Sequence, residues 1–210
     1  MASFPNAGSG RIVRAIAATI VENKAYLSEI DGKIGDGDHG VNMAKGFGRA
    51  AERISDDASL AEAMSTLSDV LMGEIGGSMG PLYGMFFMEM SEAIEDADRI
   101  DAERFAAMLR AGFDGVQSVG SASVGDKTMI DALAPAVEAA ERGAGDMRTL
   151  LSAVAAAAEA GRDSTRDMAA KLGRASRLGE RSRGVLDAGA TSCAMILRGL
   201  ADGAAGRLDH

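Results

Sequence analysis

The chain has 210 residues, 47% of them hydrophobic, which is enough to build the core of one domain and argues against a disordered protein. Its formal net charge of −9 provides no basic field for a nucleic-acid backbone or an anionic membrane, so both partners are excluded. With Cys193 as the only cysteine, no visible leader and no apolar run near the roughly 20 residues of a membrane span, we expect a cytoplasmic protein with one domain over 1–210.

Apolar residues recur at helical spacing along the chain, starting with Ile12, Ile16 and Ile20 in the first stretch. The stretches with this pattern are 10–30, 47–54, 60–71, 82–94, 102–119, 129–137, 150–172 and 189–203. Asp101 is expected to cap the fifth stretch, whose buried face would run to Val119. We therefore predict an all-α protein of about eight helices, arranged as an antiparallel bundle or a closed ring. Composition does not choose between these two.

Glycines gather in four clusters, and each cluster lies at the end of a predicted helix or between two helices. They are GDGDHG at 35–40, GGSMG at 76–80, VGDKT at 124–128 and the Gly/Arg-rich stretch 173–189. Because the ends of antiparallel helices converge on one rim, we expect the functional site where these clusters meet.

Three familiar motifs fail on inspection. The run 35–40 fits a GxGxxG dinucleotide loop, but a predicted helix precedes it where a strand is needed. Read from Asp36 as an EF-hand, it places Val41 where glycine is required and Phe47 where glutamate is required. Residues 120–128 approach a Walker loop, but Asp126 interrupts the Gly-Lys pair and again no strand precedes.

A cluster of carboxylates remains on the first glycine-rich turn. Asp31, Asp36 and Asp38 fall within eight residues, where bare carboxylates would repel one another. Oxygen ligands without cysteine suit Mg²⁺ better than Zn²⁺, and bound magnesium leaves positions that phosphate oxygens commonly take. His39 and Asn42 are placed to face the same site. A solvated acidic turn that caps a helix is the alternative explanation of the spacing.

The GGSMG cluster suits an anion, and apolar residues in or after it suit a ring system. GGSMG predicts a helix start at which Ser78 caps and free N–H groups face an anion. Met79, Leu82 and Met129 are candidates to cover an apolar ring, although methionine at helical spacing is more often core.

The Gly/Arg-rich stretch is poor in apolar residues, which is typical of a flap over a polyphosphate and equally of a solvated loop. Its arginines are Arg174, Arg177, Arg181 and Arg183. Asp187 is predicted to anchor this flap or to contact a ribose hydroxyl.

Together these motifs resemble the L subunit, the DhaL-type nucleotide-binding subunit, of bacterial dihydroxyacetone kinases. The matching runs are YLSEIDGKIGDGDHGVNMAKGF, GGSMGPLYGMFF, GDKTMIDALAPA, GRASRLGERSRG and DAGATS, in the family's order over nearly the whole chain. The first run is highly specific, and the others support it. The resemblance implies an antiparallel eight-helix barrel with ADP or ATP bound at one end.

By this resemblance, Asp31, Asp36 and Asp38 hold two Mg²⁺ ions that bridge the nucleotide phosphates, and they share the catalytic role with His39. The implied nucleotide-contacting positions are His39, Val41, Asn42, Ser78, Met79, Gly120, Met129, Arg174, Asp187, Ala188 and Gly189. Two of these depart from the family: Met79 replaces a common small hydroxyl residue, and Ala188 a common proline.

The resemblance also implies partners. A K subunit would hold the ketose covalently and accept the phosphoryl group, and a phosphotransferase-system protein is a candidate phosphodonor. The sequence allows a homodimer. Two other functions compete: the nucleotide domain of a fatty acid kinase, which usually has threonine in place of His39, and a nucleotide-sensing regulator that contacts a transcription factor.

Overall fold

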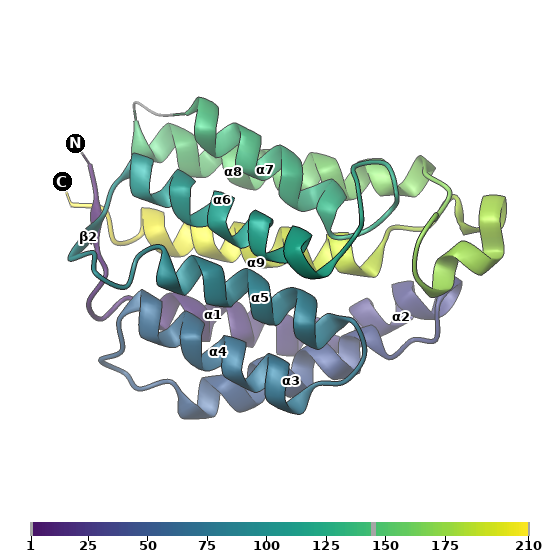
Figure 1. The fold of residues 1–210 in the computed structure, drawn as a ribbon, viewed down its shortest axis with the longest axis horizontal. Coiled ribbons are helices and arrows are strands. Elements are labelled where there is room, and N and C mark those ends of the chain that lie inside the picture. Colours follow the sequence, from purple (N-terminus) through teal and green to yellow (C-terminus); the bar gives the residue numbers. More distant parts are fainter. Residues whose placement is uncertain (1, 144–145, 210) are drawn as a thin grey trace.

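The structure, a computed structural model, describes residues 2–143 and 146–209, and within these ranges it is almost entirely helical (Figure 1). The helices are α1 (Arg11–Glu22), α2 (Lys24–Ile34), α3 (His39–Arg53), α4 (Leu60–Glu74), α5 (Met79–Glu92), α6 (Ala102–Val119), α7 (Ile130–Arg142), α8 (Met147–Ser164) and α9 (Ala188–Ala205), with the 3-10 segments η1 (Thr165–Asp167) and η2 (Arg174–Ser182). The all-α prediction is confirmed.

Eight of the helices form a closed antiparallel ring. Each packs on the next in the order α1, α3, α4, α5, α6, α7, α8 and α9, and α9 returns to pack on α1. Composition left a bundle and a closed ring open, and the structure shows the ring. Helix α2 is the additional element: it extends from one end of the ring, where η2 also lies, while both chain termini lie at the opposite end (Figure 1).

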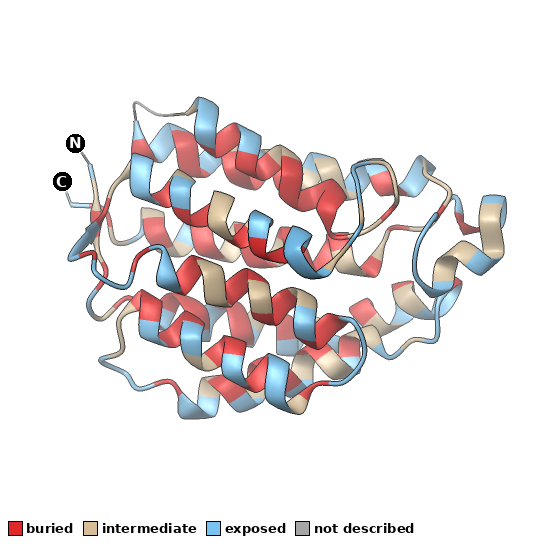
Figure 2. Ribbon diagram, viewed as in Figure 1, coloured by how far each residue is buried: buried red, intermediate tan, exposed pale blue. Residues whose placement is uncertain are grey.

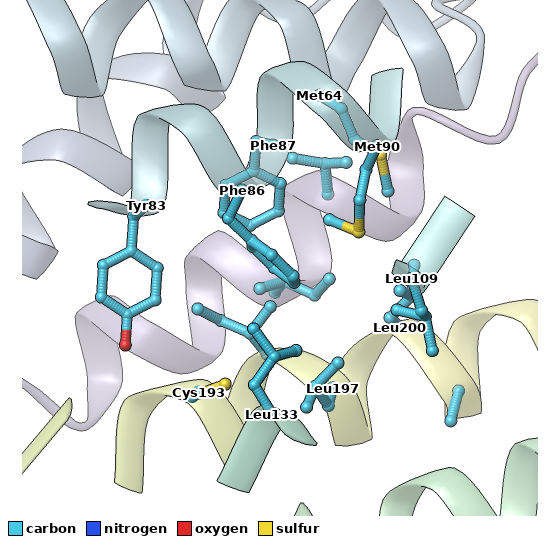
Figure 3. Packing of buried hydrophobic residues seen from close by; sticks show 14 of the residues in the cluster. Met64, Tyr83, Phe86, Phe87, Met90, Leu109, Leu133, Cys193, Leu197 and Leu200 are labelled. Atoms are coloured by element: carbon cyan, nitrogen blue, oxygen red, sulfur yellow. The ribbon is translucent and has the colours of Figure 1, made fainter. Parts of the chain in front are cut away.

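Buried residues occupy the inner faces of the ring helices (Figure 2). At its centre, Phe86 and Phe87 of α5 contact edge to face with ring centroids 5.1 Å apart, and Phe87 meets Phe47 of α3 at 5.9 Å. Leu133 of α7 and Cys193 of α9 complete this layer (Figure 3). Cys193 is fully buried, and burial raises its pKa.

The first predicted stretch is divided, which corrects the expectation of one helical run over 10–30. Asn23 separates α1 from α2 with φ −91° and ψ 11°, and its side-chain amide donates to the carbonyl of Thr19 at 2.8 Å. Asparagine favours such local bonds over helix continuation, so the chain changes direction here. The break frees α2 to leave the ring.

The predicted stretch 150–172 is also too long. Helix α8 ends at Ser164, where the hydroxyls of Ser164 and Thr165 bond to carbonyls one turn back, and Met168 and Leu172 lie beyond it. A third correction concerns Val119, which is 49% exposed at the end of α6. The cap at Asp101 is confirmed, because its carboxylate accepts from Arg104 N at 2.9 Å.

A short pair of strands not predicted from the sequence joins the N-terminal segment to the connection between α5 and α6. β1 (Phe4–Pro5) pairs antiparallel with β2 (Arg99–Ile100), and Phe4 and Ile100 are buried partners. In the part of the chain that the structure describes, no helix combines the length and apolar character needed to cross a bilayer.

Candidate functional site

A cavity of about 710 Å³ opens at the end of the ring that carries α2 and η2. Four connections frame it: the chain from α1 to α3, which includes α2, and those from α4 to α5, α6 to α7 and α8 to α9. These connections contain the four glycine clusters. The expectation that the clusters meet at one rim is confirmed.

The N-termini of four helices point into this cavity. The first residues of α3, α5, α7 and α9 lie in its wall, namely His39, Met79, Ile130 and Ala188. The first turn of a helix has N–H groups without intrahelical partners and carries a partial positive charge. Backbone N–H groups at four helix starts therefore border a space that suits an anion, while the C-terminal ends of α2 and α6, at Ile34 and Gly120, border it too.

The predicted carboxylates converge at the mouth of the cavity. Asp31 lies on α2, whereas Asp36 and Asp38 lie on the turn before α3, and one oxygen from each falls within 4.8 Å of the others. The turn depends on Gly37, whose φ of 77° is readily adopted only by glycine. Gly40 brings α3 against α2, because a Cβ there would lie 2.1 Å from the carbonyl oxygen of Lys24.

Arg174 is the one arginine of the Gly/Arg-rich stretch that lines the described cavity wall. Its guanidinium pairs with Asp36 and lies 3.4 Å from Asp38. Arg183 instead pairs with Glu180 of its own segment at 2.5 Å. Arg174 thus compensates part of the charge of the carboxylate cluster, as a metal ion would.

His39 is held between the carboxylates and the core. Its backbone N–H donates to Asp31 at 3.3 Å, and its Nε2 lies 2.8 Å from the hydroxyl of Ser192. Ser192 in turn lies 2.7 Å from the hydroxyl of Tyr83, which donates to the carbonyl of Gly189 at 3.0 Å. Burial lowers the pKa of His39 to about 4, with Asp31 opposing, so the imidazole is neutral at pH 7.

An apolar part of the cavity wall comes from α5, α6 and the start of α7. Met79, Leu82 and Met129 all line the cavity, as their assignment to a base-covering surface requires. Ser78 precedes α5 at the N-cap position, but its hydroxyl makes no capping bond, which corrects the predicted cap. Its φ and ψ of −74° and −22° are already helical, and capping requires an extended residue.

Asp187 precedes α9 as its N-cap and forms part of the cavity wall with Ala188 and Gly189. Its carboxylate accepts from Ala190 N at 2.7 Å and caps the helix. Burial raises the pKa of Asp187 to about 7, although the capping bond opposes this.

Of the remaining predicted site residues, two line the cavity and one does not. Asn42 and Gly120 line the cavity, but Val41 is 47% exposed on α3 and does not. Sequence reasoning missed Tyr83 and Ser192, which support His39. Both fall inside runs that carry the resemblance, but no spacing rule links positions more than 100 residues apart.

A family model described as "DAK2 domain" matches residues 33–202. The chain is 39% identical over 183 residues to the Listeria innocua protein named "PEP-dependent dihydroxyacetone kinase 1, ADP-binding subunit DhaL", covering 86% of this chain and 88% of that protein. It is 35% identical over 199 residues to a D-erythrulose kinase of Mycolicibacterium smegmatis, covering 91% of this chain and 34% of that protein.

Among solved structures, the fold matches the dihydroxyacetone kinase of C. freundii in complex with AMP-PNP and Mg²⁺. The TM-score is 0.66 at 28% identity, and the match covers 92% of this chain and 33% of that chain. The chain therefore spans about a third of that kinase and nearly the full length of the separate Listeria subunit.

Proposed function

The chain belongs to the DAK2 domain family, among its DhaL-type subunits, and from this premise we propose that it is the Mg-nucleotide-binding, phosphoryl-transfer subunit of a dihydroxyacetone or related short-ketose kinase. One observation carries the proposal: three carboxylates converge within 4.8 Å at the mouth of a cavity into which four helix N-termini point. A solvated acidic turn would not require that arrangement.

The carboxylate cluster fits magnesium. Asp31, Asp36 and Asp38 supply only hard oxygen donors, they are at least partly exposed, and Arg174 already pairs with two of them. These aspartates would hold two Mg²⁺ ions. When bound, Mg²⁺ neutralises charge on phosphate oxygens and orients them for transfer.

The cavity suits an adenine nucleotide in size and polarity. Its volume of about 710 Å³ lies within the range typical of small-molecule sites. Met79, Leu82 and Met129 would cover the base, and the Asp187–Gly189 segment would contact the ribose side. The N-termini of α3 and α5 would donate backbone N–H groups to the phosphates.

We assign His39, with its neutral imidazole, a positioning role rather than the role of a base. With its Nε2 against Ser192 and its backbone N–H on Asp31, it fixes the start of α3 beside the phosphates. Phosphoryl transfer proceeds mainly by positioning and charge neutralisation, so no base on this chain is required. The chain alone should be nearly inactive.

The acceptor hydroxyl therefore comes from a partner. Exposed apolar residues gather on the segments that frame the cavity, with Val119 49%, Val124 64% and Leu172 37% exposed, which is typical of a docking surface. We assign this surface to a K subunit that holds the ketose covalently. The ketose is dihydroxyacetone or erythrulose, the substrates named for the relatives.

The test combines binding with transfer. Mg-ADP should raise the melting temperature of the isolated chain more than ADP with a chelator does, and Asp36→Asn should reduce that difference. With the cognate K subunit, the chain should phosphorylate a short ketose from ATP or from a phosphotransferase-system donor. Equal stabilisation with chelator present, or no transfer with either donor, would refute the assignment.

A further inference from the structure

Lys127, in the loop that sequence analysis rejected as a Walker motif, is a buried cation with three backbone partners. The residue is 2% exposed, and its Nζ donates to the carbonyls of Met168, Ser182 and Val185 at 3.2, 2.7 and 2.7 Å. An ammonium group has three N–H donors. All three are therefore used within the protein.

The three carbonyls flank the segment that contains Arg174. Met168 precedes η2, whereas Ser182 ends it and Val185 follows it. The hydroxyl of Ser182 also accepts from Ala170 N at 2.8 Å. Lys127 thus closes the base of a loop over 169–182 whose far part lies against α2.

The backbone of Lys127 is held in a conformation that is unfavourable for a residue other than glycine. Its φ is 64°, the only positive value outside glycine in the described ranges 2–143 and 146–209. Asp131, at 2% exposure, fixes the loop by accepting from Gly125 N at 2.6 Å and Thr128 N at 2.8 Å. Strain maintained by such a network commonly marks a functional position.

Burial also lowers the pKa of Lys127, chiefly through loss of hydration, which shows that the site disfavours a free charge there. An apolar residue would fill the same space without that penalty. The three carbonyls that the ammonium group joins therefore explain why a cation is buried at this position.

We propose that Lys127 is a positioning residue for phosphate binding: it closes the base of the 169–182 segment and so holds Arg174 opposite Asp36 and Asp38. This inference rests on the proposed function of that site. Lys127 is not itself a phosphate ligand, because its three protons are already donated to carbonyls. Its effect on the nucleotide passes through Arg174.

Two variants distinguish the effect of the Lys127 side chain from that of its backbone conformation. Lys127→Gly suits a φ of 64° and removes only the side chain, and Lys127→Met keeps the apolar stem without the ammonium group. The matched control is Lys171→Met, because the Lys171 ammonium also joins these two segments, at 3.3 Å from Asp126, but its side chain is 64% exposed.

Limited trypsin digestion without metal or nucleotide measures directly whether Lys127 holds the 169–182 segment closed. The exposed Arg177 and Arg181 lie in the segment, and cleavage there requires local opening. Both Lys127 variants should be cut in 174–183 about tenfold faster than wild type, by the population of the open form, whereas Lys171→Met should match wild type. Unchanged cleavage at this segment would overturn the proposal.

Calorimetric titration with Mg-ADP measures the effect of Lys127 on nucleotide binding. Lys127→Gly should weaken binding by about tenfold, but in an Arg174→Ala background it should add less than about twofold, because the two residues act as a unit. Full additivity, or loss of cooperative folding in both Lys127 variants, would overturn the proposal. If wild type fails to bind Mg-ADP, the proposed function fails, while trypsin digestion still decides whether Lys127 holds the 169–182 segment closed.

Discussion

Asp187→Asn should change how the stability of the protein depends on pH. Burial raises the pKa of the Asp187 carboxyl from 3.8 to about 7. A carboxyl whose pKa is raised by folding binds a proton more tightly in the native state than in the unfolded state. Its contribution to the unfolding free energy is complete below pH 3.8 and is lost as the pH rises through 7.

The size of the effect follows from the shift. A change from 3.8 to about 7 corresponds to ~4 kcal/mol at 1.36 kcal/mol per unit. Of this, ~2.7 kcal/mol falls between pH 5 and pH 8, where ordinary surface carboxylates are ionised in both states and contribute little. Asparagine cannot ionise, and it accepts the capping bond from Ala190 N as aspartate does.

The assay is urea unfolding of wild type and Asp187→Asn at intervals from pH 5 to pH 8, with chelator and without nucleotide. The variant should gain ~2.7 kcal/mol relative to wild type across this range, because only wild type loses stability at that position as pH rises. His39, whose pKa is lowered to about 4, contributes the opposite slope, but it is common to both proteins and cancels on subtraction.

Asp126→Asn is the matched control. The backbone N–H of Ser123 lowers the pKa of Asp126, so its contribution to stability is lost only below pH 3.8 and the difference from wild type should be flat above pH 5. Parallel curves for wild type and Asp187→Asn would refute the reasoning. So would a variant that loses stability relative to wild type as pH rises.

Three other substitutions test how the site is built. Gly40→Ala places a Cβ 2.1 Å from the carbonyl oxygen of Lys24, so calorimetry should show a loss of about 1–3 kcal/mol or more from overpacking. Arg174→Ala should change the free energy of unfolding by less than ~1 kcal/mol, because the side chain is 57% exposed, yet titration should show about tenfold weaker binding of Mg-ADP. Tyr83→Phe removes the hydroxyl bonded to the carbonyl of Gly189 and should lower the urea midpoint by an amount equivalent to about 1–2 kcal/mol. Unchanged stability of Gly40→Ala or Tyr83→Phe, or unchanged binding of Mg-ADP by Arg174→Ala, would contradict the contact on which that prediction rests.

Local chemistry determined what the sequence could predict. The helical period located the ring helices, and the crowding of Asp31, Asp36 and Asp38 identified the metal-binding candidates, because those three residues are close in the chain. Both signals operate over a few residues. The break at Asn23 was missed because an apolar period continues across it and a single asparagine is a weak signal.

The long-range contacts required the structure. Lys127 reaches carbonyls 41, 55 and 58 residues away, and the link from His39 to Ser192 spans 153 residues. Backbone carbonyls leave no trace in a sequence, so nothing marked them as partners of a lysine. The same run that failed as a Walker loop on local context is explained by contacts that no motif describes.

The closed ring accounts for how a chain of net charge −9 could bind the polyphosphate that we propose for it. In an up-and-down ring, every second connection reaches the same end, and at that end each connection leads into a helix N-terminus. The four glycine clusters occupy those connections. Of the three connections at the end that carries the chain termini, 54–59 and 93–101 contain no glycine and 143–146 contains two. Overall charge governs long-range attraction, but the local field at the cavity comes from four helix ends, Arg174 and the cations that three aspartates would hold. The end of this acidic, all-helical ring that carries the four glycine clusters therefore combines helix N-termini, Arg174 and three aspartates, which is the combination that the proposed phosphate site requires.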